Sequence, residues 1–405
     1  MGKYYQKNRY VSFWDTVEDE DGLWVADICM NGLFKIKKDG SDVEYVAPFE
    51  MERIGKAGHG LYFYAVSYGD EIFFLPKFSF NVAVYSRKKK VLQYIYLPYI
   101  GGVAGYGIVG YALYGEWMYL FSTYADCSMI RIHMTTWEVE ELQIWKDILG
   151  KFSDKKNHLI TASAVQINND VWMDIYHTNK LLRYSLVDDS YEIIEYDYDI
   201  YKVFGNESLQ ELYIVPRKKK QVVIWDLRSR KKKQCIELGD FICDNNKIRN
   251  ILSDEELFVF IPDYEKYILL IDRKSNTIRK YDSFPQEYTS FKTDNRFFYS
   301  GRIRSEYIEL FPYMANGIIR IDRKSGEAML QCTEIPWKGS IGDLVLQYHY
   351  QNSITNVECN EFIYPLEHFL EVLSSGEGHK KEYEGGKVGK DIAEAVLSES
   401  KRGKI

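Results

Sequence analysis

The feature that most constrains this chain is a short pattern that returns seven times along its 405 residues. In each copy an apolar, strand-like run is followed by a tight polar turn rich in Asp, Lys, Ser and Gly. Two copies are nearly identical, because residues 271–276 read Ile-Asp-Arg-Lys-Ser-Asn and residues 321–326 read Ile-Asp-Arg-Lys-Ser-Gly. Self-similarity at a fixed period indicates stacked copies of one supersecondary unit, so a single repeat domain can use most of the chain.

The period follows from the last apolar residue before each polar turn. These residues are Ile36, Tyr85, Ile132, Tyr184, Trp225, Ile271 and Ile321. Successive copies lie 41 to 52 residues apart, with a mean of about 47 residues. This spacing is typical of units that contain four strands.

The second copy illustrates how one unit divides into strands. Its apolar runs at 61–67, 72–75, 82–85 and 91–96 predict four short strands, because turn residues separate them at short, regular intervals. In four copies the second strand ends in an apolar residue and a proline, which stops a strand because it has no N–H to donate. These pairs are Leu75-Pro76, Val215-Pro216, Ile261-Pro262 and Phe311-Pro312.

Tandem units of four antiparallel strands predict an all-β fold, the β-propeller, in which blades close radially around an axis. In period and strand pattern, residues 9–335 resemble kelch-type and WD-type propellers. A Trp-Asp pair occurs once, at 225–226, and a double glycine at 101–102. We expect seven blades. Six or eight stay open, because 296–300 and 307–311 are either the first two strands of the last blade or a second strand plus an inserted one.

After residue 335 the repeat ends. We expect a closing segment and a helix over 336–373, a flexible polar linker over 374–386, and a short amphipathic helix and tail over 387–405. In the last segment Val388, Ile392 and Val396 recur every four residues. The apolar stripe of 387–400 either packs on its own propeller or docks on a partner.

The bulk properties favour some classes of protein over others. The net charge of −7 argues against a nucleic-acid-binding protein, whose footprint is a basic face. The six cysteines show no metal-ligand spacing, and the first residues lack the apolar stretch of a signal peptide. We therefore expect a cytoplasmic protein with reduced thiols, no metal and no cofactor. The nearly uncharged segment 101–121 is expected to form two buried strands rather than a membrane span.

One set of candidate residues comes from the phase of the repeat. Counting one period at a time places four polar or amphipathic side chains just before the innermost strands of successive copies: Tyr10, His59, Tyr106 and His158. Residues at this place surround one mouth of the central channel, so they predict a ring of hydrogen-bonding groups for a polar ligand. Alternatively, they only cap the solvated ends of the strands.

A second set lies in the loops between the second and third strands, which open on the same face. The candidates are Lys77, Tyr124, Tyr176, His177, Arg217, Tyr264 and Tyr313. Aromatic residues interleaved with basic ones suit stacking on sugar rings or gripping an acidic peptide. The alternative is that they are ordinary solvated loop residues.

No strong catalytic motif is present in the sequence. We therefore expect a non-catalytic binding or scaffold propeller that recognises a protein or glycan through its aromatic and basic loops. The alternative is a glycan-processing enzyme of the lyase or isomerase type. In such an enzyme the general base would be His59, His158 or His177. The general acid would be Tyr106 or Tyr176, and Arg217 would bind the carboxylate of the substrate.

Overall fold

A computed structural model of the chain describes residues 10–28, 31–38, 40, 42–49, 60–98, 105–124, 127, 129–142, 148, 159–242, 248–263, 265–290 and 297–335. By its contacts the chain divides into two units, Met1–Tyr364 and Pro365–Ile405, and all described residues belong to the first unit. The predicted segments 336–373, 374–386 and 387–405 lie outside the described residues.

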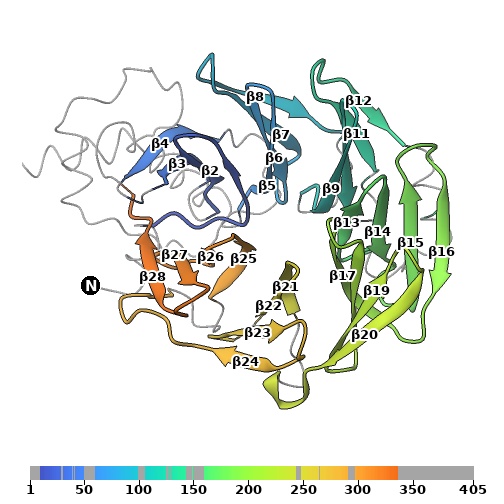
Figure 1. Cartoon of the computed structure of the whole chain (residues 1–405). Helices are drawn as coiled ribbons and strands as arrows, with labels where there is room; N and C mark the ends of the chain where they lie inside the picture. Colours follow the sequence, from blue (N-terminus) through green and yellow to red (C-terminus); the bar gives the residue numbers. More distant parts are fainter. Residues whose placement is uncertain are drawn as a thin grey trace, which may run out of the picture. The chain divides into compact units, whose positions relative to one another are not determined.

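The first unit is a seven-bladed β-propeller (Figure 1). Each blade is one antiparallel sheet of four strands that are consecutive in sequence, and the innermost strand comes first. The strands are β1 (Thr16–Glu18), β2 (Gly22–Ala26), β3 (Gly32–Lys37) and β4 (Val43–Pro48) in blade 1; β5 (Tyr62–Tyr68), β6 (Glu71–Pro76), β7 (Asn81–Ser86) and β8 (Val91–Tyr96) in blade 2; β9 (Ile108–Tyr114), β10 (Trp117–Ser122), β11 (Ile130–His133) and β12 (Val139–Glu141) in blade 3; β13 (Ala164–Ile167), β14 (Asp170–Asp174), β15 (Lys180–Ser185) and β16 (Tyr191–Glu195) in blade 4; β17 (Ile200–Asn206), β18 (Glu211–Pro216), β19 (Gln221–Asp226) and β20 (Lys231–Glu237) in blade 5; β21 (Ile248–Ser253), β22 (Leu257–Pro262), β23 (Ile268–Asp272) and β24 (Ile278–Tyr281) in blade 6; and β25 (Phe298–Ile303), β26 (Tyr307–Pro312), β27 (Gly317–Asp322) and β28 (Ala328–Cys332) in blade 7. A 3-10 turn, η1 (Gly239–Phe241), follows β20.

These bounds confirm the predicted architecture. The four strands expected in the second copy are β5 to β8, shifted by no more than about a residue or two at their ends. The strands β25 and β26 are the first two of blade 7, which settles the open count at seven. The nearly uncharged segment forms β9 and β10, and the described residues include no helix long and apolar enough to cross a membrane.

Proline ends strands and aspartate stabilises a turn at the positions that the sequence predicts. Strands β6, β18, β22 and β26 each end at their proline, after which the chain leaves the sheet. In the turn between β27 and β28 the Asp322 carboxylate accepts N–H bonds from Lys324 at 2.8 Å and Ser325 at 2.7 Å. Gly326 completes this turn at a φ of +74°, which glycine adopts without strain.

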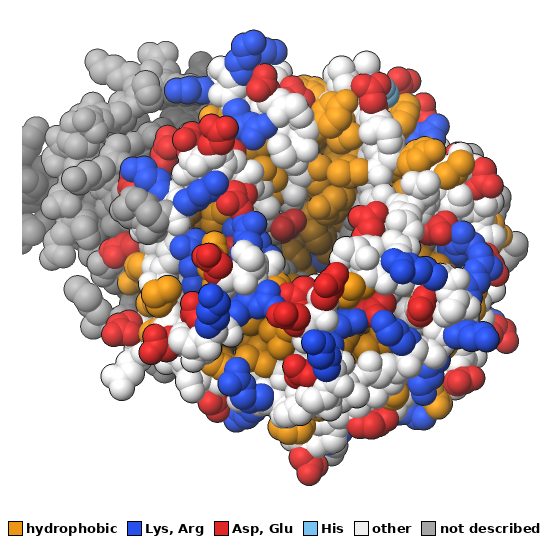
Figure 2. All heavy atoms as spheres, viewed as in Figure 1, with side chains coloured by type: hydrophobic (Ala, Val, Ile, Leu, Met, Phe, Trp, Pro, Cys, Tyr) orange, Lys and Arg blue, Asp and Glu red, His pale blue; other side chains and the backbone are white. Residues whose placement is uncertain are grey.

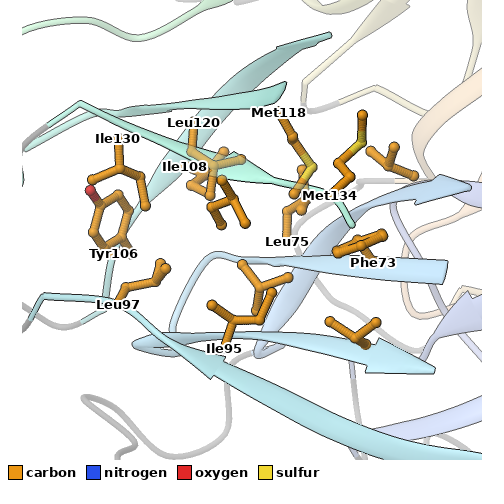
Figure 3. Close-up of a cluster of buried hydrophobic side chains, with 14 of the residues drawn as sticks. Phe73, Leu75, Ile95, Leu97, Tyr106, Ile108, Met118, Leu120, Ile130 and Met134 are labelled. Carbon is orange, nitrogen blue, oxygen red and sulfur yellow. The ribbon is translucent and has the colours of Figure 1, made fainter. Parts of the chain in front are cut away.

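The hydrophobic core lies between the blades. Each of the seven interfaces between neighbouring blades, the one between blades 7 and 1 included, holds a cluster of buried apolar side chains. Figure 3 shows the cluster between blades 2 and 3, where Phe73 and Leu75 meet Met118 and Leu120. The second strands supply much of this core, because both of their faces are covered by neighbours.

A short clasp closes the ring. The Val11 N–H donates to the Thr333 carbonyl at 2.8 Å, and the Thr333 hydroxyl donates to the Val11 carbonyl at 2.9 Å. Tyr10 and Glu334 form an antiparallel bridge beside them. The segment before blade 1 is therefore paired with the segment after blade 7, while every blade keeps its own four strands.

The topology gives the ring two distinct faces. One face carries the starts of the innermost strands and the loops between second and third strands, and we call it the loop face. The other carries the first-to-second and third-to-fourth turns, and we call it the turn face. Six of the predicted binding residues lie in loops between second and third strands, on the loop face: Lys77, Tyr124, Tyr176, His177, Arg217 and Tyr313.

Candidate functional site

The innermost strands carry a bulge near the loop face. In five of them, among the residues that the structure describes, the pairing to the second strand skips one residue. The skipped residues are Phe63, Val109, Tyr201, Arg249 and Tyr299. A bulge redirects a side chain out of the regular alternation of the strand, and bulges are frequent beside binding sites.

Three aromatic rings from blades 7, 1 and 2 gather at this level, and we call them the aromatic cluster: Trp14, Phe63 and Tyr299. Trp14 stacks on Phe63 at 5.1 Å between ring centroids and lies 5.0 Å from Tyr299. Trp14 and Phe63 stay half-buried. Figure 2 shows the centre of the ring hollowed, with hydrophobic side chains along one part of the hollow and charged side chains around it.

Three cations from blades 2, 5 and 6 lie near one another at this level, and we call them the cationic group: Lys77, Lys202 and Arg249. The Arg249 guanidinium lies 5.5 Å from the Trp14 ring and 5.6 Å from the Tyr299 ring. The Lys77 ammonium lies 6.0 Å from Phe63 and donates to the Ile108 carbonyl at 3.2 Å. These contacts place positive charge directly over aromatic faces, which attract it.

The members of the cationic group lie close enough for their charges to act on one another. Burial lowers the pKa of Lys77 to about 8, and the charges of Lys202 and Arg249 act in the same direction. Arg249 is paired with the buried Asp263, to which its Nε donates at 2.7 Å. An anion bound between the cations would therefore relieve their mutual repulsion.

A carboxyl group lies deeper in the ring. Burial raises the pKa of Asp15 to about 6, although hydrogen bonds from the Thr16 N–H at 2.8 Å and the Ala65 N–H at 3.4 Å oppose the shift. Burial, together with the negative charge of Asp15, raises the pKa of Tyr64 and of Tyr111. An acid that titrates near pH 6 can donate or accept a proton near neutral pH.

The predicted loop residues of blades 4 and 5 form a second aromatic and basic group. The Tyr176 ring stacks on His177 at 3.8 Å between centroids, and the Arg217 guanidinium lies 5.6 Å from the Tyr176 ring. The Arg217 Nε is buried and has no hydrogen-bond partner. The Arg217 guanidinium therefore lies beside an aromatic face with one of its donors unsatisfied.

Other predicted residues lie inside the protein. Tyr106 is 1% exposed and belongs to the core between blades 2 and 3 (Figure 3), so it does not stand at the channel mouth. The reason is phase: Tyr62 and Ile108 occupy equivalent positions in their strands, so Tyr106 corresponds to Gly60 and not to His59. Burial raises the pKa of Tyr106 well above its ordinary value.

The remaining predicted tyrosines support the structure around the channel. Tyr124 is half-buried against the core between blades 2 and 3. Tyr313 is 4% exposed and lies 4.3 Å from the Tyr299 ring, so it backs the aromatic cluster. Tyr10 belongs to the clasp.

Three predicted residues, His59, His158 and Tyr264, lie outside the described residues. In the part of the chain that the structure does describe, no three His, Cys, Asp or Glu side chains gather to hold a metal. The sequence did not single out Trp14, Asp15 or Arg249. Each of them lies in or just before an innermost strand. A charged or bulky residue in such a strand was the sequence signal that could have identified them.

The comparisons with known proteins extend to the fold alone. No protein-family model matches the sequence, and no curated protein matches it. Among solved structures the chain is similar to virginiamycin B lyase from Staphylococcus aureus, at 12% identity and a TM-score of 0.54, over 81% of this chain and 94% of that one. It is also similar to Sqt1 from Saccharomyces cerevisiae, at 11% identity and a TM-score of 0.53, over 80% of this chain and 85% of that one.

A third similar structure is Hsv2 from Kluyveromyces lactis, at 9% identity and a TM-score of 0.50, over 80% of this chain and all of that one. One of the three proteins is a lyase by name, so the fold does not separate catalysis from binding. The chain is a seven-bladed β-propeller.

Proposed function

We propose that this chain is a non-catalytic binding propeller that recognises an acidic partner, a glycan or a stretch of protein, at the loop-face mouth of its channel. The observation that carries the proposal is the convergence of Lys77 and Arg249 on the aromatic cluster, with the charge of Lys202 acting on Lys77. Cations attract the carboxylates of a partner, and half-buried aromatic faces accept sugar rings or apolar side chains. The Tyr176–Arg217 pair supports the same chemistry elsewhere on the loop face.

The test compares binding of two probes, polygalacturonate and polyglutamate, by titration calorimetry. Lys77→Gln removes one charge and keeps a donor for the Ile108 carbonyl. We expect it to weaken binding of the preferred probe about tenfold. Lys88→Gln is the matched control, because Lys88 is an exposed lysine of the turn face.

Equal affinity of wild type and Lys77→Gln for both probes would overturn the proposal. Binding of only one probe decides between a glycan and a protein partner. Binding of the anionic probe should also weaken as ionic strength rises, because salt screens the attraction between opposite charges.

The pH dependence of binding follows from Lys77. Its ammonium is charged below pH 8 and loses its proton above that value. Affinity for an anion is therefore constant below about pH 7 and falls up to about tenfold by pH 9. Lys77→Gln should abolish this fall, while Lys88→Gln should retain it.

A second candidate function, a glycan-processing enzyme of the lyase or isomerase type, is favoured by Asp15. Its pKa of about 6 suits a general acid or base beside an anion-binding group. The test is release of unsaturated or isomerised product from acidic oligosaccharides by wild type and Asp15→Asn. Product formation that Asp15→Asn abolishes would replace the binding proposal, whereas no product from either supports it.

We also propose a reducing, cytoplasmic location. The thiol of Cys235 is free, which supports a compartment where disulfides do not form. The test is the localisation of a tagged chain. Secretion of the tagged chain would overturn it.

A further inference from the structure

The interface between blades 4 and 5 holds a pocket of about 180 Å³ that is separate from the channel. It lies between two tryptophans, Trp172 of β14 and Trp225 of β19. Trp172 is the third residue of the second strand of its blade, and Trp225 is the fifth residue of the third strand of the next. Other interfaces between neighbouring blades have residues at these same two strand positions.

At two other interfaces these positions are filled by rings in contact. Trp24 and Tyr85, between blades 1 and 2, lie 5.0 Å apart between centroids. Tyr119 and Tyr184, between blades 3 and 4, lie 6.5 Å apart. Between blades 4 and 5 the two indoles make no ring contact within the described structure, because Trp225 packs edge-on against Tyr196 instead, at 6.0 Å. The pocket occupies the space that ring contact fills elsewhere.

The pocket also contains a hydrogen-bond donor without an acceptor. Trp172 is 6% exposed, and its Nε1 is buried with no partner. At the equivalent position in blade 1 the Trp24 Nε1 donates to the Asp19 carboxylate. The residue of blade 4 that corresponds to Asp19 is Ile167, whose side chain has no acceptor. A buried donor without a partner is destabilising, and an acceptor on a ligand would offset this cost.

The rest of the wall is apolar or already paired. Ile194 and Leu227 add apolar surface. Arg183 lies 6.0 Å from the Trp172 ring and is held by Asp170 at 2.8 Å and Glu192 at 3.6 Å. The pocket is therefore a fixed slot with aromatic and aliphatic sides rather than a gap that side chains can fill by rotating.

The rim of the pocket is strongly basic. Arg230 lines the pocket and belongs to the turn between β19 and β20. Four side chains of this hairpin are exposed and pair with no carboxylate in the described part of the chain: Arg228, Arg230, Lys231 and Lys232. Four exposed cations on one hairpin, of which Arg228 also acts on Asp226, complement a run of carboxylates.

We propose that this pocket takes an aromatic side chain from an acidic peptide segment of a partner protein. The flat ring enters between Trp172 and Trp225, where the equivalent interfaces have rings in contact. The neighbouring carboxylates of the peptide meet the basic hairpin, and an oxygen of the peptide accepts from the Trp172 Nε1. This site lies on the turn-face side of blades 4 and 5, so it acts independently of the channel mouth.

The probe is a fluorescein-labelled heptapeptide, Asp-Glu-Asp-Phe-Asp-Glu-Asp, and its partner peptide with Ala in place of Phe. Fluorescence anisotropy measures both affinities on the full chain. We expect the Phe peptide to bind, and the Ala peptide to bind about tenfold more weakly or worse. Leu227→Phe fills the slot and should reduce the preference for Phe over Ala.

Charge variants separate the pocket from a general attraction. Arg230→Glu/Lys232→Glu should weaken the Phe peptide about tenfold or more, since these side chains have no structural partner. Lys88→Glu/Lys89→Glu, on the corresponding hairpin of blade 2, is the matched control and should change affinity far less. Arg230→Glu/Lys232→Glu should weaken binding of the Phe peptide far more than Lys77→Gln does, which keeps this result distinct from the channel experiment.

Four outcomes would overturn the proposal. They are no binding of the Phe peptide, equal affinity of the Phe and Ala peptides, equal loss in the two double variants, and binding of polygalacturonate but not of peptide at the hairpin. The last outcome would make the occupant an acidic glycan.

Discussion

Blades 2 and 7 place opposite chemistry at the same three positions. On the face that each blade turns toward the next, one residue from each of the first three strands lies beside the others. In blade 2 these three are buried and apolar: Val66, Phe73 and Val84. In blade 7 they are charged: Arg302, Glu309 and Arg320.

The charged row of blade 7 is fully partnered. Glu309 is 0% exposed, and both of its oxygens accept guanidinium hydrogen bonds, from Arg302 and from Arg320, the latter at 2.9 Å. Arg302 also reaches Glu18 of blade 1 at 3.2 Å, so the row spans the interface that closes the ring. These three positions therefore require side chains that fill the interface and whose polar groups are all paired. Apolar side chains are only one way to meet this requirement.

The largest effect is expected from breaking the charged row. Glu309→Gln leaves two guanidinium groups at the interface without their shared carboxylate. We expect a loss of about 3–5 kcal/mol in the free energy of unfolding, measured by urea denaturation. Glu306→Gln, exposed on the same blade, is the control and should change little. A loss as small as the control's would mean that the row contributes no more than surface charges do.

The charged row also acts on the channel, which gives a pH test. Arg302 helps hold down the raised pKa of Asp15. Because that pKa is higher in the folded chain, the Asp15 contribution to stability is complete below about pH 4 and is lost as pH rises through 6. Asp15→Asn should therefore stabilise the chain by about 1–3 kcal/mol at pH 7.5 and by nothing at pH 3.5. Urea denaturation at both values checks this, and a gain that persists at pH 3.5 contradicts it.

A smaller effect is expected from the apolar row of blade 2. Phe73→Leu leaves a small cavity in the cluster of Figure 3 and should cost about 1–2 kcal/mol. Salt should not change this cost, because no charge is involved. The free energy of unfolding, measured at low and high salt, distinguishes the apolar row from the charged row. A strong salt dependence of the Phe73→Leu loss would contradict this prediction.

The smallest effect is expected when blade 7 receives the chemistry of blade 2. Arg302→Val/Glu309→Phe/Arg320→Val replaces the charged row as a unit and leaves no buried ion unpaired. We expect the free energy of unfolding to stay within about 1 kcal/mol of wild type. A loss as large as that of Glu309→Gln would show that the ions specify closure of the ring and do not merely fill it.

The sequence was sufficient for the architecture because local signals repeat. Each polar turn, each proline at the end of a second strand and each apolar run recurs once per blade, so errors in one copy are corrected by the others. The strands of blade 2 and the Asp322 turn are placed as predicted. Closure through Val11 and Thr333 had no local signal, since it pairs residues at opposite ends of the repeat.

The candidate site was less accessible because the bulges shift the phase. A bulge adds one residue to a strand and interrupts the regular alternation of its side chains. The side chains beyond the bulge therefore point to a different face from the one that the sequence spacing predicts. Phe63, Arg249 and Tyr299 reach the aromatic cluster for this reason. Lys77 and Arg217 were identified from loop composition, which a phase shift in the inner strand does not alter.

The clasp between Val11 and Thr333 has a consequence for how such a chain can change over generations. Every sheet of this ring is encoded by one uninterrupted stretch of the chain. Duplicating or deleting a stretch of that length would add or remove a whole blade without splitting another. A circularly permuted gene that starts between blades 3 and 4 would also preserve all seven sheets, because the clasp already holds Val11 beside Thr333.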